Sequence, residues 1–98
     1  MKLQELFAKI KEDSLTKEQL EHFHREMSEV YAMMHLELGD IKKRKAMFML
    51  TDPEKTAVAK SREWGGTQDG QREITLKSYI KATSTHLSSL RSRLYNLY

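Results

Sequence analysis

The sequence predicts an all-α protein, an antiparallel hairpin of two long, coiled-coil-like helices with a short N-terminal helix and a short connecting helix. Charged residues make up 32% and hydrophobic residues 39% of the 98 positions, with one Pro, a composition typical of helical proteins. Apolar residues recur at spacings of three and four almost throughout, which is the helical period. The two longest such stretches flank the segment 52–70, which contains the only Pro and three of the four Gly. The length allows one domain, residues 1–98.

The first predicted helix covers residues 2–12. Its apolar side chains recur at i, i+3, i+4 and i+7, so they share one face. They are Leu3, Leu6, Phe7 and Ile10. So short a helix with one narrow apolar face needs a partner, and we expect it to cover one end of the hairpin after a turn at residues 13–15.

The second predicted helix covers residues 17–50. Thr16, followed three residues later by Gln19, fits a capping box that opens it. Apolar residues then recur every seven positions, as expected for a long packed helix. They are Leu20, Met27, Met34, Ile41 and Phe48. Gly39 is the position where this helix could bend or end, because Gly costs about 1 kcal/mol relative to Ala inside a helix.

A third helix over residues 53–64 is predicted from Asp52 as the cap and Pro53 as the first helical residue. Three glycines make residues 65–70 the predicted flexible loop. The last helix should cover residues 71–96, where apolar residues alternate at spacings of four and three, interrupted at Thr83. These apolar residues are Leu76, Ile80, Leu87, Leu90, Leu94 and Leu97.

Charge is divided unevenly along the chain. Residues 1–40 carry 5 Lys and Arg against 9 Asp and Glu, whereas residues 41–98 carry 12 against 5. A basic stretch either binds a polyanion or complements acidic residues packed beside it. In the second interpretation, Arg91 and Arg93 would face the acidic residues of the second helix, and the two interpretations lead to different functions.

The first interpretation predicts a nucleic-acid interface at the basic end of the hairpin. Phosphate binding needs accessible cations, and binding to single strands adds an aromatic ring on which bases stack. The candidates are Lys42, Lys43, Arg44, Lys45, Lys60, Arg62, Trp64, Arg72 and Lys77. Two alternatives stay open. Trp64 would close the hairpin as a core residue, and the run 42–45 would be solvated because consecutive residues point around the helix.

A second set of candidates is apolar and predicts an interface with a partner or with further copies of the chain. A small domain buries a modest fraction of its surface, so self-association is the default expectation. The candidates are Met34, Leu38, Ile80, Leu87, Leu90, Leu94 and Leu97. Further apolar residues lie outside the main seams and would leave a lone hairpin with an exposed strip. They are Tyr31, Leu36, Met47, Ile74 and Tyr79.

Catalysis is not expected. The chain has no Cys, so thiolate chemistry and sulfur-ligated zinc are excluded. Glu21 and His24 have the Glu-x-x-His spacing of di-iron bundles, but such sites need two copies and further carboxylates, so no metal and no cofactor are expected. Residues 1–13 are amphipathic and charged, and no apolar run approaches the roughly 20 residues of a membrane span. We expect a soluble, cytoplasmic protein with no membrane partner.

The C-terminal half combines a Trp, a Gly-Gln turn and a basic helix that ends in a Ser-Ser-hydrophobic-basic-Ser-Arg run. The residues are Ser61, Arg62, Glu63, Trp64, Thr67, Gly70, Gln71, Ile74, Leu76, Lys77, Lys81, Ala82 and the run 87–94. This pattern resembles a group of small, uncharacterised phage and prophage helical proteins. Residues 1–13 also resemble the start of the recombination mediator of T-even phages.

These resemblances imply a phage protein that acts in the host cytoplasm. The expected function is that of a non-enzymatic accessory protein that binds single- or double-stranded DNA in recombination or replication. The alternative is an inhibitor or adaptor that binds a host or defence protein through its helical surface.

Overall fold

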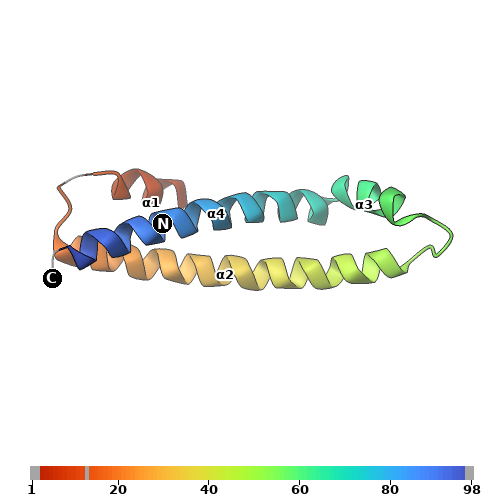
Figure 1. Cartoon of the computed structure of the whole chain (residues 1–98), viewed down its shortest axis with the longest axis horizontal. Helices are drawn as coiled ribbons and strands as arrows, with labels where there is room; N and C mark the ends of the chain where they lie inside the picture. Colours follow the sequence, from red (N-terminus) through yellow and green to blue (C-terminus); the bar gives the residue numbers. More distant parts are fainter. Residues whose placement is uncertain (1–2, 13, 97–98) are drawn as a thin grey trace.

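The computed structural model describes residues 3–12 and 14–96, and in these ranges the chain forms four helices and no strand. The helices are α1 (Leu3–Ile10), α2 (Lys17–Leu50), α3 (Ala57–Gly65) and α4 (Gln68–Tyr95). The long helices α2 and α4 lie side by side and antiparallel, with α3 at the bend and α1 at the opposite end (Figure 1). The predicted all-α hairpin is confirmed.

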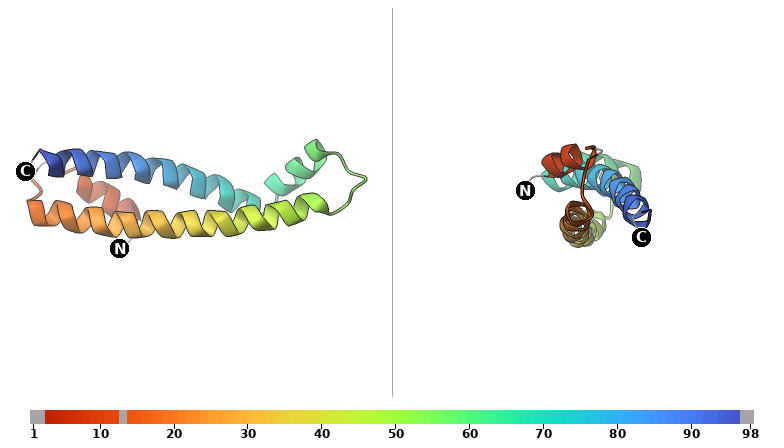
Figure 2. Two further views of the ribbon diagram at one scale, coloured as in Figure 1. Left: turned by 60° about the horizontal axis from the view of Figure 1, so that its bottom comes forward. Right: turned by 90° about the vertical axis from the view of Figure 1, so that its left-hand side faces the viewer.

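The hairpin is a rod. Its principal extents are 59 × 20 × 19 Å and its radius of gyration is 18.0 Å, whereas a compact domain of this length has about 13 Å. Viewed end-on, α1 and α4 lie together on one side of α2 (Figure 2, right). The opposite side of α2 therefore faces solvent along the rod.

One end of the rod is held by α1. Thr16 and Gln19 form the predicted capping box, with Thr16 Oγ1 accepting from the Gln19 amide at 3.2 Å and Gln19 Oε1 accepting from the Thr16 amide at 2.9 Å. Residues of α1, α2 and α4 then bury a shared apolar cluster. Its buried members are Leu6, Ile10, Leu20, Phe23, Met27, Leu87 and Leu90. The structure thus confirms that the first helix covers one end of the hairpin.

α2 continues through Gly39 without a break. No side chain lies within 4 Å of the position that a Cβ of Gly39 would occupy. Leu38 and Ile41, on either side, are both buried. Burying two large apolar side chains stabilises the helix by more than the roughly 1 kcal/mol that Gly costs.

The third helix begins later than predicted. Asp52 has φ +50°, a left-handed conformation that a helix cap does not have, and Pro53 lies in the connection that follows α2. Thr56 is the actual cap, because its Oγ1 accepts a hydrogen bond from the Ala59 amide at 3.1 Å. The predicted start at residue 53 is therefore wrong, and residues 51–56 form the bend of the hairpin.

The predicted flexible loop at residues 65–70 is also wrong. α3 ends at Gly65 and α4 begins at Gln68, with Thr67 as its cap: Thr67 Oγ1 accepts from the Gly70 amide at 3.0 Å. Gly70 is buried inside α4, and a Cβ there would lie 1.9 Å from the carbonyl oxygen of Trp64. Gly70 is needed for this close approach of the two helices rather than for flexibility.

A second apolar cluster fills the bend half of the rod. Its buried members are Met34, Leu38, Ile41, Trp64 and Leu76. The Trp64 ring lies 5.5 Å from that of Phe48, centroid to centroid. α3 thus folds back over α2 and inserts the only Trp of the chain into the core.

Candidate functional site

The basic residues of the predicted nucleic-acid interface gather at the bend half of the rod, where α2, α3 and α4 meet. Four of these eight cations, Arg44, Lys45, Arg72 and Lys77, contact carboxylates of the same chain. Arg44 makes two hydrogen bonds to Asp69, at 2.8 and 3.1 Å. Arg72 makes two to Glu37, at 2.6 and 3.0 Å. These paired contacts hold the Arg44 guanidinium group against α4 and the Arg72 guanidinium group against α2, and they offset the charge of both.

Glu73 is the centre of this network. Its side chain is 7% exposed, and it accepts from Trp64 Nε1 at 3.2 Å. Lys45 Nζ lies 3.3 Å and Lys77 Nζ 3.7 Å from its carboxylate oxygens. Burial raises the pKa of Glu73, but the Trp64 hydrogen bond and the two ammonium groups outweigh burial and hold the pKa below its ordinary 4.5. Glu73 is therefore ionised and partnered at neutral pH.

Each of the two arginines lowers the pKa of the carboxylate that it contacts. The hydrogen bond from Arg72 lowers the pKa of Glu37, and the hydrogen bond from Arg44 lowers the pKa of Asp69. Both arginines therefore face ionised carboxylates at neutral pH. Basic residues of the second half thus pair with acidic residues of the same chain, but not the residues that were expected. Arg91 Nε lies 3.4 Å from His24 Nε2, and Arg93 donates to the Ile10 and Glu12 carbonyls.

Lys60 and Trp64 are not accessible. The Lys60 ammonium donates to the Met49 carbonyl at 2.8 Å, and the residue is buried. Trp64 is 5% exposed, so it cannot stack on a base in this conformation. Trp64 is instead a core residue that closes the hairpin, as in the alternative interpretation. Within residues 3–12 and 14–96, Lys42, Lys43 and Arg62 are the predicted phosphate-binding cations with no hydrogen bond or ion pair.

The predicted interface residues lie mainly inside the hairpin. Met34, Leu38, Leu87 and Leu90 are buried in its two apolar clusters, so they stabilise the single chain. Ile80 and Leu94 are half-buried at the edges of those clusters. The remaining candidate, Leu97, lies outside the described residues. A surface for a partner must therefore be sought elsewhere.

The solvent side of α2 provides such a surface. Its large apolar residues Met33, Leu36, Met47 and Leu50 are 69 to 81% exposed. Together with exposed Asp40 and Lys43 they follow spacings of three and four along one face. This set, which we call the outer stripe, consists of Met33, Leu36, Asp40, Lys43, Met47 and Leu50. Two exposed apolar pairs on one helix face, with a charged pair between them, are typical of an interaction site.

Only part of the outer stripe was predicted from the sequence. Leu36 and Met47 were expected in an exposed strip, whereas Met33 and Leu50 were missed. The pattern that indicates them is a second row of residues at alternating spacings of three and four. This row lies on a different face of the helix from the buried row through Met34 and Ile41. Two such rows on one helix indicate two packed faces.

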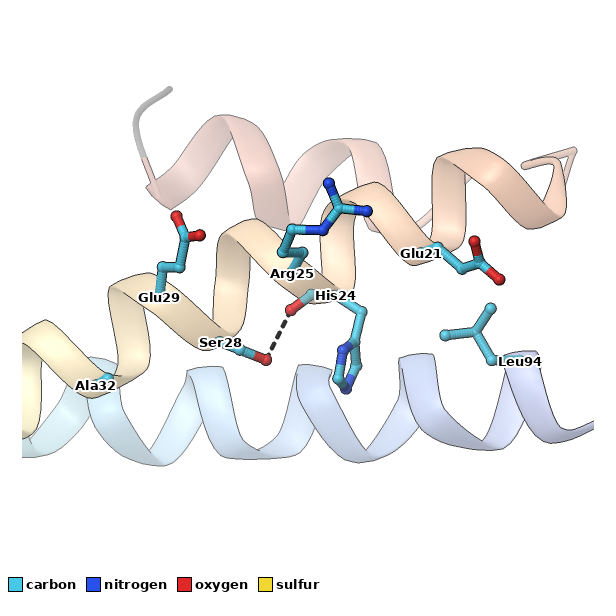
Figure 3. Close-up of a pocket in the computed structure, with 7 residues that line it drawn as sticks. All are labelled: Glu21, His24, Arg25, Ser28, Glu29, Ala32 and Leu94. Atoms are coloured by element: carbon cyan, nitrogen blue, oxygen red, sulfur yellow. Dashed lines mark hydrogen bonds between the residues drawn. The ribbon is translucent and has the colours of Figure 1, made fainter.

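A groove lies at the other end of the rod, between α2 and α4. It has a volume of about 610 Å³. Its lining residues are Glu21, His24, Arg25, Ser28, Glu29, Ala32 and Leu94. Figure 3 shows His24 pointing from α2 toward α4, and Ser28 Oγ donating to the His24 carbonyl, at 2.7 Å. No cluster of three or more His, Asp or Glu able to hold a metal ion occurs in residues 3–12 and 14–96, so Glu21 and His24 gain no further ligand there.

No protein-family model, curated protein sequence or solved structure matches this chain. Over the residues that the structure describes, no helix is both long and apolar enough to cross a membrane.

Proposed function

We propose that this chain is a non-enzymatic adaptor or inhibitor that binds another protein through the outer stripe of α2. The observation that carries the proposal is the exposure of four large apolar residues on one face of one helix. Leaving such a face in water is unfavourable, by about 25 cal/mol for each Å² of apolar surface. A protein partner that covers it recovers this free energy, whereas a nucleic acid backbone does not.

The internal ion pairs support a protein partner over DNA. To bind phosphate, Arg44 or Arg72 would have to leave a carboxylate that already accepts two of its hydrogen bonds. Releasing these cations costs part of the binding energy that counterion release supplies. The resemblance of the C-terminal half to small phage and prophage proteins is the reason to seek the partner among host proteins, in the host cytoplasm.

A DNA-binding accessory protein is the second candidate function. It is favoured by Lys42, Lys43 and Arg62, the three predicted cations near the bend that have neither a hydrogen bond nor an ion pair in the described ranges. The two functions predict different salt dependence. For duplex DNA, the slope of log K against log salt is about −0.9 for each phosphate contacted. Three cations therefore give about −3, and all eight predicted cations would give about −7.

A fluorescence titration with short single- and double-stranded oligonucleotides between 50 and 200 mM salt, a range chosen around physiological conditions, tests this choice. We expect weak binding with a slope for duplex DNA no steeper than about −3. In the matched variant Lys42→Ala/Arg62→Ala, the slope of log K against log salt should be shallower still. Tight binding with a slope near −7 would overturn the protein-binding proposal in favour of DNA.

Capture from a nuclease-treated bacterial lysate tests the protein-binding proposal directly. The wild-type chain should retain a protein partner that the variant Leu36→Ser/Met47→Ser loses. Ile74→Ser is the matched control, because Ile74 is 60% exposed but lies on α4. Partners that disappear on nuclease treatment, or that the stripe variant retains, would count against the proposal.

A further inference from the structure

The outer stripe is complementary to itself when two copies of α2 run in opposite directions. Residue pairs whose numbers add to 83 then lie opposite each other: Met33 faces Leu50 of the second copy and Leu36 faces Met47. In the middle, Asp40 faces Lys43 of the second copy, and Lys43 faces Asp40 of the second copy. Antiparallel coiled coils pair successive positions of a three-four repeat in this way. We propose that the partner on the outer stripe is a second copy of this chain, in a two-fold symmetric antiparallel dimer.

Charge selects the antiparallel direction. A parallel pair would place Asp40 against Asp40 and Lys43 against Lys43, which is unfavourable on both counts. The antiparallel pair converts the same residues into two opposite-charge contacts flanked on both sides by apolar layers. Within residues 3–12 and 14–96, neither Asp40 nor Lys43 makes an ion pair in the single chain. The hydrogen bond to Asp69, together with the charge of Asp40 one turn away, raises the pKa of Arg44. Since no salt bridge holds Asp40 or Lys43 in these ranges, both can contact a second copy.

The backbone also permits close approach. The residues directly before Met33, Asp40 and Met47 are Ala32, Gly39 and Ala46, so one flank of the stripe carries small side chains at every seventh position. Gly39 has nothing within 4 Å of its missing Cβ. A facing helix can therefore lie near the α2 backbone at the centre of the interface. This explains a Gly in the middle of a continuous helix, where the single chain shows no packing reason for it.

The dimer would be longer than its subunits. The stripe covers the bend half of each rod, so antiparallel pairing leaves the half that carries α1 projecting on each side. With 1.5 Å per residue and the two-fold axis between positions 41 and 42, the two Lys17 residues lie about 74 Å apart. The single chain has a longest extent of 59 Å.

Charge exchange tests this inference, which rests on the proposed protein-binding role of the stripe. Lys43→Asp creates like-charge contacts at the centre and should weaken dimerisation by at least about tenfold in sedimentation equilibrium. Asp40→Lys/Lys43→Asp restores opposite charges and should recover it. Mixing the single variants Lys43→Asp and Asp40→Lys should give a heterodimer. Lys42→Asp is the matched control, because it changes the same charge one residue away from the stripe and should leave dimerisation unchanged.

Cross-linking tests the direction, and the chain has no Cys of its own to interfere. A mixture of Leu36→Cys and Met47→Cys should oxidise to a disulfide-linked heterodimer. Leu36→Cys alone should not, because its two copies would lie about 17 Å apart along the helices, too far for a disulfide. Efficient linking of Leu36→Cys to itself would overturn the antiparallel arrangement.

Failure of the inference and failure of the proposed function are distinguishable. A chain that stays at 11.5 kDa at every concentration overturns the dimer, and the protein-binding role then depends on the stripe-specific capture of a different protein. An unchanged dimer after Lys43→Asp likewise overturns the stripe as the dimer interface. Steeply salt-dependent DNA binding overturns the proposed function instead.

Discussion

Glu73 shows how a single side chain determines what the basic end of this molecule can do. It lies on α4, and its carboxylate joins Trp64 of α3, Lys45 of α2 and Lys77 of its own helix. Lys77 is four residues from Glu73 on the same helix, a spacing that the sequence shows, whereas Lys45 is 28 residues away, and its contact was missed for that reason. Such contacts depend on the register of α2 against α4, which residue types and spacings alone do not specify.

We predict that Glu73→Ala destabilises the fold. The substitution leaves the Trp64 indole N–H and the Lys45 ammonium without their acceptor in a mostly buried place, which should lower the free energy of unfolding by about 2 kcal/mol. Urea unfolding monitored by the fluorescence of Trp64, the only Trp, measures this. The exposed Glu54→Ala is the control and should change stability by less than about 0.5 kcal/mol. Equal stability of the two variants would contradict the assigned role of Glu73.

Acid should destabilise the protein in two stages. Burial, together with the charge of Lys11, lowers the pKa of His86 below its ordinary 6.5. The unfolded chain therefore binds more protons as pH falls below 6.5, and stability declines. The pKa values of Glu37, Asp69 and Glu73 are also lowered, so a second loss begins below about 4.5, where the unfolded carboxylates take up protons first.

Circular dichroism melting curves between pH 7 and 2.5 measure both stages. His86→Phe keeps a ring to stack on Phe7, which now lies 4.3 Å away between centroids, and removes the titrating group. This variant should lose the first stage and keep the second. A wild-type melting temperature that stays constant down to pH 3 would contradict the ion pairs at the bend.

At the scale of helices, the sequence predicts which segments are helical better than where each helix begins. α2 begins where it was predicted because Thr16 and Gln19 supply a local cap, and its buried row repeats every seven residues, whereas its continuity through Gly39 was left open by the sequence. α3 was misplaced because Asp52 and Pro53 satisfy the same local rules, yet the chain must reverse there and Asp52 adopts a left-handed conformation. Local signals specify a cap only where the tertiary path allows it.

The glycines at residues 65–70 were misread for a similar reason. Gly usually indicates flexibility in sequence reasoning, but Gly70 is required by the 1.9 Å clearance to the Trp64 carbonyl oxygen. This contact joins two helices and has no signature in the sequence. The contacts of the basic residues were missed in the same way, since their gathering at the bend was predicted and their carboxylate partners were not.

Two Gly→Ala substitutions distinguish a glycine that the fold requires from one that it does not require. At protein concentrations too low for dimerisation, Gly39→Ala should raise the free energy of unfolding by about 1 kcal/mol, because Ala favours the helix and the added methyl group meets nothing in the single chain. Gly70→Ala should lower it by at least about 2 kcal/mol, because the methyl group would overlap backbone. Urea unfolding compares the two. Similar effects of both substitutions would contradict the described junction between α3 and α4.

At the scale of the whole molecule, the chain is a rod with two different sides. α1, α3 and α4 cover one side of α2 (Figures 1 and 2). The large apolar residues of the outer stripe are exposed on α2. Four of the eight predicted phosphate-binding cations at the bend contact the chain's own carboxylates, whereas the large apolar residues of the outer stripe stay exposed. This difference is the reason that we place a protein, and first a second copy of the chain, on that surface instead of DNA.

The most direct test is the molar mass in solution by light scattering, measured at increasing protein concentration with and without a short duplex oligonucleotide. Our account predicts a mass that rises from 11.5 kDa toward about 23 kDa, twice the chain mass, and is unchanged by the oligonucleotide at physiological salt. A constant 11.5 kDa that increases only when the oligonucleotide is present would contradict it.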